Sequence, residues 1–155
     1  EKSYCKTASL IANSSKAIGV LSDVDQESLN SLYFFGRQLG LAFQVVDDIL
    51  DFTGNDEQLG KPAASDLQSG YLTAPVFYAL DENPTLSELI NGKFSKKDDL
   101  DKALSLVRDS SAISKSRELA EKFASESKDS ISWLPDSPSK KALLELPEFV
   151  ISRLY

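Results

Sequence analysis

Three aspartates near the middle of the chain are the residues whose type and spacing best fit a chemical role. Asp47, Asp48 and Asp51 interrupt the stretch VVDDILDF, which is otherwise apolar. On a helix, Asp47 and Asp51 lie one turn apart and Asp48 is adjacent, so the three carboxylates point into one sector. Aspartate is a poor interior helix residue, and like charges one turn apart oppose each other. Helix formation alone therefore does not explain the pattern.

A divalent cation explains it. In a half-buried groove with an effective dielectric constant of about 20, two like charges about 6 Å apart repel by about 3 kcal/mol. A cation between the carboxylates turns this repulsion into attraction, and carboxylate oxygens suit Mg²⁺. The alternative is a solvated acidic helix end. The apolar residues around the aspartates favour the metal site, and they are Val45, Val46, Ile49, Leu50 and Phe52.

A long helix over residues 25–53 must position these aspartates. Gly36 and Gly40 lie one turn apart on it, where a missing side chain lets a second helix approach closely. The stretch 3–18 also reads as a helix. The apolar positions of residues 25–53 have the period of one buried helix face, and they are Leu32, Phe35, Leu39, Phe43, Val46 and Leu50. The small residues of 3–18 that permit tight contact are Ala8, Ala12 and Ser15.

The rest of the chain also reads as helices and loops, which predicts an all-α fold. Residues 19–25 are typical of a turn, in which Ser22, Asp23 or Asp25 caps the long helix. Residues 53–71 are rich in Gly, Pro, Ser and Asn and predict a long loop, in which Asp66 either caps a short helical turn or supports the metal ligands.

The C-terminal half of the chain predicts several helices. One begins at residues 73–75 and stops near Asn83 and Pro84, and helical segments follow to residue 155. Pro147 is expected to kink or divide the last of them. The charge runs at 96–101 and 115–122 predict solvated faces.

Composition narrows the classes of function. The 155 residues carry a net charge of −7 without a basic stripe, which argues against nucleic acid as a partner. Histidine is absent, which excludes His-based catalysis and His-ligated metals for this chain, and the single Cys5 fits a reducing compartment. No apolar run approaches the ~20 residues of a membrane span. The chain lacks methionine and begins at Glu1, so we expect a piece of a longer polypeptide.

Four motifs together resemble the C-terminal half of a trans-isoprenyl diphosphate synthase. They are Y-x-K-T-A from Tyr4, G-R-Q-L-G-L-A-F-Q-x-x-D-D-I-L-D from Gly36, G-K at Gly60, and D-L-x-x-G-x-x-T-A-P ending at Pro75. The loop and the closing L-P-E-F-V-I-S-R-L-Y are most similar to long-chain enzymes of the solanesyl diphosphate type from plant plastids and cyanobacteria. The resemblance implies an all-α bundle with a deep central cavity, in which residues 1–155 form the C-terminal part of a single synthase domain.

The resemblance also implies an activity. Family members are Mg²⁺-dependent prenyltransferases that condense an allylic prenyl diphosphate with isopentenyl diphosphate, here into a long-chain all-trans product. Asp47, Asp48 and Asp51 become the second of two aspartate-rich, metal-binding motifs. The positions that match contacts to the allylic diphosphate or orient the metal ligands are Lys6, Thr7, Gln44 and Lys61. The resemblance gives catalytic roles to Lys6, Gln44, Asp47 and Lys61. Tyr71 stands where many members have lysine, so it is assigned no diphosphate role.

Several further expectations follow from the resemblance. In the family, the first aspartate-rich motif and the isopentenyl diphosphate site precede the position of Tyr4, so this stretch alone is expected to be inactive. The expected assembly is a homodimer or a heteromer with another synthase subunit. The expected compartment is the plastid, with the cytoplasm and the mitochondrion as alternatives. The functional alternatives are a non-catalytic regulatory subunit of a synthase, a terpene cyclase, whose usual second metal motif we do not find, and a helical interaction module.

Overall fold

The computed structural model describes residues 1–54, 65–96 and 98–155. Within these ranges the regular secondary structure is helical and contains no strand, which confirms the all-α class. The chain divides into two compact units, and each is described by itself. The first comprises Glu1–Val46 and Leu119–Tyr155, and the second comprises Asp47–Glu118. The predicted loop residues 55–64 lie outside the described part of the chain.

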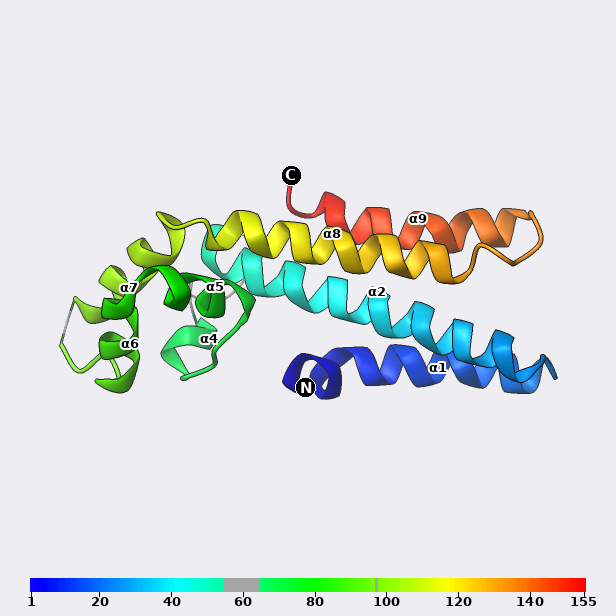
Figure 1. Ribbon diagram of the computed structural model, residues 1–155, viewed down its shortest axis with the longest axis horizontal. Helices are drawn as coiled ribbons and strands as arrows, with labels where there is room; N and C mark the ends of the chain where they lie inside the picture. The colour runs from blue at the N-terminus through cyan, green and yellow to red at the C-terminus, as the bar shows by residue number, and fades with distance from the viewer. Residues whose placement is uncertain (55–64, 97) are drawn as a thin grey trace. The chain divides into compact units, whose positions relative to one another are not determined.

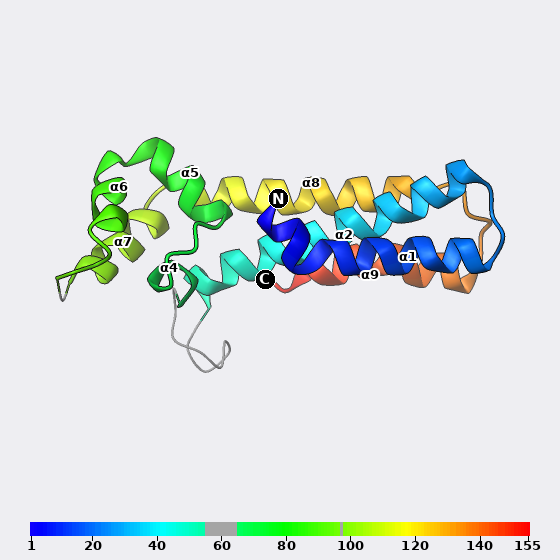
Figure 2. The ribbon, with the colours of Figure 1, turned by 90° about the horizontal axis from the view of Figure 1, so that it is seen from below.

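The first unit is built from long helices that run side by side (Figures 1 and 2). Within it α2 runs alongside α1 and alongside α8. The 28 residues of α2 confirm the long helix predicted over residues 25–53. The elements of the unit are η1 (Tyr4–Ala8), α1 (Ser9–Leu21), most of α2 (Gln26–Thr53), the later part of α8 (Ala112–Ser130) and α9 (Pro138–Ser152).

The contact of α2 with η1 and α1 is as close as the small residues of these segments predicted. A Cβ atom on Gly36 would lie 2.6 Å from the carbonyl oxygen of Ile11, and one on Gly40 would lie 2.5 Å from Ala8 Cα. Real Cβ atoms essentially never approach other heavy atoms so closely, so any larger residue at either position would force the neighbouring backbone to shift. Ala8 and Ala12 are fully buried in this contact region. The predicted close packing is confirmed.

The first helix ends later than predicted. Residues 19–25 were expected to form a turn, but α1 continues to Leu21. Gly19 does not end the helix because it serves another purpose. It is buried, and a Cβ atom there would lie 2.7 Å from Leu32 Cδ1 on α2. This glycine therefore allows close approach rather than chain reversal.

Hydrogen bonds fix α2 at its start and along its side. The Ser28 N–H donates to Asp25 Oδ1 over 2.8 Å, so Asp25 is the capping residue among the predicted candidates. This backbone hydrogen bond lowers the pKa of the Asp25 carboxyl. Farther along, the buried Ser127 of α8 donates through Oγ to the Phe35 carbonyl over 3.1 Å. The position of α2 is thus fixed by Asp25 in the preceding turn and by Ser127 of α8.

The second unit surrounds one apolar core. Besides the last residues of α2 and the first of α8, it contains α4 (Ser65–Gln68), α5 (Ala74–Glu82), α6 (Pro84–Asn91) and α7 (Asp99–Arg108). The boundary between α5 and α6 confirms the predicted stop near Asn83 and Pro84, because proline suits the start of a helix. The fully buried core side chains include Phe52, Leu67, Val76, Leu86 and Val107.

Two expectations for the C-terminal half are wrong in part. Of the two outcomes expected at Pro147, division of the last helix does not occur, since α9 continues through this residue; its ring is buried, and this packing opposes the cost of the lost backbone hydrogen bond. The charge run 96–101 is not wholly solvated, because Asp99 is 7% exposed. Asp99 accepts the Lys96 N–H through Oδ2 over 2.9 Å. Among the helices described, none is long and apolar enough to cross a membrane.

Candidate functional site

The three aspartates lie in the last two turns of α2, within the second unit. Asp48 is 4% exposed and Asp51 is 1% exposed, whereas Asp47 is partly exposed. Ile49 and Phe52, which lie between and beside them, are fully buried. Asp48 and Asp51 are therefore not part of a solvated acidic helix end, and the apolar surroundings expected from the sequence are confirmed.

Asp51 holds the start of α4. Ser65 Oγ donates to Asp51 Oδ1 over 3.3 Å, and the Asp66 N–H donates to Asp51 Oδ2 over 3.2 Å. Asp66 lies in the first turn of α4, and its carbonyl oxygen accepts the Tyr71 N–H over 2.8 Å. The carboxylate thus ties the start of α4 to the end of α2.

The chemistry of these side chains fits a hard divalent cation. Carboxylate oxygens are the ligands that Mg²⁺ takes from proteins, and buried carboxylates attract a cation more strongly than solvated ones. Within residues 1–54, 65–96 and 98–155, no group of three or more His, Cys, Asp or Glu side chains is already arranged to hold a metal ion. The three aspartates are of the right residue type for Mg²⁺, and their carboxylates would have to move closer together to bind one ion.

Thr7 and Gln44 meet in the first unit. Thr7 Oγ1 donates to Gln44 Oε1 over 2.6 Å, and Gln44 is 4% exposed. Lys6, the neighbour of Thr7, is exposed. The structure therefore brings together two of the predicted diphosphate-site residues and leaves the Lys6 side chain accessible. Lys61 lies outside the described residues, so its predicted role stays a prediction.

Lys6 and Thr7 lie in η1, a π-helical turn that the sequence analysis missed. The pattern of residues 3–18 predicts an ordinary helix, but the Ser9 N–H donates to the carbonyl oxygen of Tyr4, one residue farther back than in an α-helix. Such turns are rare and often occur at functional sites. No periodicity in so short a stretch distinguishes five residues of π-helix from α-helix.

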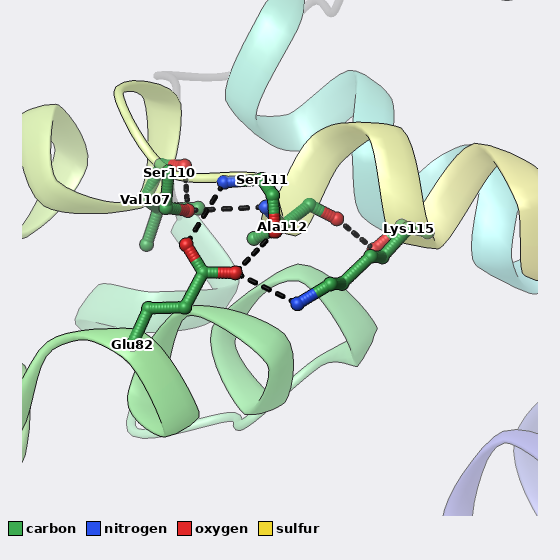
Figure 3. A network of polar contacts seen from close by, with 7 residues as sticks. Glu82, Val107, Ser110, Ser111, Ala112 and Lys115 are labelled. Carbon is green, nitrogen blue, oxygen red and sulfur yellow. Dashed lines mark hydrogen bonds and ion pairs between the residues drawn. The ribbon is translucent and has the colours of Figure 1, made fainter.

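A second polar cluster joins α5 to the start of α8 in the second unit (Figure 3). Glu82 accepts the Ser111 N–H through Oε2 over 3.1 Å and Lys115 Nζ through Oε1 over 2.8 Å, and Ser111 Oγ also donates to Oε1. The hydrogen bonds from Lys115 and Ser111 lower the pKa of Glu82 to about 2. Lys115 is therefore not simply part of a solvated face, as its charge run predicted.

Arg108 is a further residue that the sequence analysis missed. Its Nε donates to the main-chain carbonyl oxygen of Phe52 over 2.8 Å, across 56 positions of sequence. Phe52 directly follows Asp51, so this contact reaches the last turn of the helix that carries the aspartates. No local signal could have paired these two residues.

Comparison with known sequences supports the resemblance. The sequence model of the family described as Polyprenyl synthetase matches residues 1–107. The chain is 52% identical over 155 residues to a prenyl transferase of Synechocystis sp., covering 100% of this chain and 48% of that protein. It is 45% identical over 153 residues to the chloroplastic solanesyl diphosphate synthase 2 of Arabidopsis thaliana, covering 99% of this chain and 37% of that protein.

Solved structures share the fold. The apo form of an Arabidopsis medium/long-chain length prenyl pyrophosphate synthase matches with a TM-score of 0.88 at 41% identity, over 99% of this chain and 54% of that one. Heptaprenyl diphosphate synthase from Staphylococcus aureus matches with a TM-score of 0.89 at 33% identity, over 95% and 47%. The chain spans about half the length of these proteins, or less. It belongs to the polyprenyl synthetase family.

Proposed function

We propose that the protein, in its full-length form, is a prenyltransferase that condenses an allylic prenyl diphosphate with isopentenyl diphosphate. The proposed product is a long-chain all-trans polyprenyl diphosphate. The observation that carries the proposal is the largely buried aspartate cluster at the end of α2, within the part of the chain that the family matches. The similarity to solanesyl diphosphate synthases supports the long product.

The proposed cofactor is Mg²⁺, with Asp47, Asp48 and Asp51 as its ligands. When bound, Mg²⁺ would supply positive charge that stabilises the leaving diphosphate. Burial of Asp48 and Asp51 supports this role, because charges attract more strongly where water is excluded. In this proposal Asp51 binds the metal and also accepts the hydrogen bonds from Ser65 and Asp66 at the start of α4, so the orientation of its carboxylate is the most restricted of the three.

The other predicted residues are proposed to bind and orient the diphosphate. Lys6 and Lys61 carry ammonium groups that donate to phosphate oxygens. The hydrogen bond from Thr7 to Gln44 Oε1 fixes which way the Gln44 amide faces, so its Nε2 group points away from Thr7. The chemistry proposed is cleavage of the allylic C–O bond, attack by the C=C of isopentenyl diphosphate, and loss of a proton, for which the released diphosphate is the proposed acceptor.

Assembly and compartment belong to the same proposal. A homodimer, or a heteromer with another synthase subunit, is the proposed assembly. The plastid is the proposed compartment, because the similar proteins include a cyanobacterial prenyl transferase and a chloroplastic synthase. The cytoplasm and the mitochondrion remain the alternatives, and fractionation of the full-length protein decides among them.

The decisive experiment assays the full-length protein with labelled isopentenyl diphosphate and allylic primers, with and without Mg²⁺. We expect metal-dependent elongation that Asp47→Ala abolishes. Asp129→Ala removes an exposed aspartate from α8 and is the matched control, for which we expect wild-type elongation. If folded full-length protein elongates no primer, the enzyme proposal is wrong and a non-catalytic regulatory subunit takes its place.

A further inference from the structure

The end of α2 concentrates negative charge. Asp47, Asp48 and Asp51 lie in its last two turns, and the carbonyl end of any helix carries a partial negative charge of its own. No basic residue lies in the last turn of α2 itself. This end of the helix is therefore best stabilised by a cation from another element.

Arg108, the last residue of α7, supplies a cation at that end. Its Nε donates to the Phe52 carbonyl oxygen over 2.8 Å. The last carbonyl groups of a helix have no partners within the helix, and here two of them are satisfied in different ways. The Leu50 carbonyl accepts the Gly54 N–H over 2.7 Å, whereas the Phe52 carbonyl accepts the Arg108 side chain.

The apolar core holds both sides of this contact. Phe52 and Val107 are fully buried and belong to the same cluster. Phe52 directly follows Asp51, and Arg108 directly follows Val107. The buried Phe52 and Val107 side chains therefore keep Arg108 beside the Phe52 carbonyl, which is only one peptide unit away from Asp51.

We propose that Arg108 is a positioning residue for the aspartate cluster, fixing the last turn of α2 and thereby the directions of the Asp48 and Asp51 carboxylates. Arg108 contacts neither substrate nor metal in this proposal, and acts only through the Phe52 carbonyl. The inference rests on the proposed function, since it concerns the same cluster. A role in stability alone would lower the unfolding temperature but leave the response to metal unchanged.

The test compares full-length wild type, Arg108→Ala and Arg108→Lys, with Lys102→Ala as the control because Lys102 is an exposed cation on the same helix. Mn²⁺ binding is measured by electron paramagnetic resonance without substrate, and the Mg²⁺ concentration for half-maximal elongation is measured separately. For Arg108→Ala we expect the Mn²⁺ dissociation constant and the Mg²⁺ concentration for half-maximal elongation each to rise roughly ten- to a hundredfold, as for other residues that orient metal ligands. Arg108→Lys should be intermediate, because an ammonium donates to one oxygen without the guanidinium geometry. Lys102→Ala should match the wild type.

Wild-type Mn²⁺ affinity in folded Arg108→Ala overturns the inference. If that variant does not fold, Arg108→Lys and Arg108→Gln replace it, and wild-type affinity in both overturns the inference equally. The two proposals fail separately: a wild type that binds Mn²⁺ but elongates nothing contradicts the synthase, while the comparison of Mn²⁺ affinities still stands. A wild type that does not bind Mn²⁺ overturns the inference about Arg108, whereas the synthase proposal is decided by elongation.

Discussion

Gly40 of α2 and Ala8 of η1 are packed so closely that a Cβ atom on Gly40 would lie 2.5 Å from Ala8 Cα and 2.9 Å from Ala8 Cβ. Thr7 precedes Ala8, and Gln44 lies one turn beyond Gly40 on α2. The same close approach that buries Ala8 therefore brings the Thr7 hydroxyl within 2.6 Å of the Gln44 amide oxygen. A packing feature that is visible in the sequence thus sets the geometry of two predicted site residues.

Gly40→Ala should destabilise the protein. Alanine favours a helix over glycine by about 1 kcal/mol, but overpacking a close helix contact costs about 1–3 kcal/mol. The clash here is with backbone atoms, which no side-chain rotation relieves. We expect the free energy of unfolding, measured by urea denaturation, to fall by about 1–2 kcal/mol.

Gly92→Ala is the matched control for that substitution. Gly92 has a right-handed backbone conformation at the end of α6, and the nearest atom to an added Cβ would be the Glu88 carbonyl oxygen at 3.2 Å. We expect a change within about 0.5 kcal/mol, as for ordinary surface substitutions. Equal destabilisation by both variants would contradict the packing argument for Gly40.

The Thr7–Gln44 hydrogen bond should be measurable as a coupling energy. Thr7→Val keeps the shape of the side chain and removes the donor, and Gln44→Leu removes the acceptor. A double-mutant cycle on the free energy of unfolding should give about 1 kcal/mol of coupling, the usual net value of one such bond. Additive single effects would show that the 2.6 Å contact contributes nothing to stability.

Asp51→Asn tests the link between α2 and α4. The amide keeps one acceptor oxygen but loses the charge that strengthens the bonds from Ser65 and the Asp66 N–H. In metal-free buffer we expect the unfolding free energy to fall by about 1–2 kcal/mol and the Asp66 amide hydrogen to exchange faster. Asp101→Asn, an exposed position on α7, should change neither quantity. Unaltered exchange at Asp66 in the Asp51 variant would contradict the link.

Stability should depend on Glu82 in a definite range of pH. Its folded-state pKa of about 2 lies below the ordinary glutamate pKa of 4.5, so ionised Glu82 stabilises the fold above pH 4.5, and this contribution is lost as the pH falls toward 2. Glu82→Gln should therefore unfold at lower urea concentration than wild type at neutral pH. The difference between the two should shrink from pH 4.5 downward.

Glu88→Gln, which changes an exposed carboxylate on α6, is the control for the pH series. Its unfolding curve should follow the wild type across the same range. A Glu82→Gln deficit that stays constant to about pH 2 would mean that hydrogen-bond geometry, and not the charge of Glu82, accounts for the effect.

Features that depend on local pattern were predictable from the sequence. The 28-residue helix α2 follows from apolar spacing, and the close approach of the preceding segment follows from Gly36 and Gly40. The start of α2 was expected near Ser22, Asp23 or Asp25, and the structure selects Asp25 among them. Each of these signals lies within one turn or one face of a helix. The three aspartates could be singled out for the same reason, because they are charged residues within a short stretch of helix that is otherwise apolar.

Features that depend on distant partners were not predictable. Arg108 and Phe52 are 56 positions apart, and Glu82 and Lys115 are 33 apart, so neither pairing leaves a mark in a local window. Gly19 misled for a related reason. A glycine near the end of an apolar run usually stops a helix, but here the side chains of Leu29 and Leu32 across the contact decide its role.

The π-helical turn Tyr4–Ala8 makes this part of the chain sensitive to length as well as to residue type. A π-turn holds one residue more than the α-turn it replaces, so removing one residue from it would restore an unbroken α-helix. Every side chain before the deletion would then rotate by about 100° around the helix axis relative to α1. The Tyr4 hydroxyl would lose its contact with the Tyr33 hydroxyl. The deletion would thus change which faces of the two segments point toward α2 without changing any of the remaining residues.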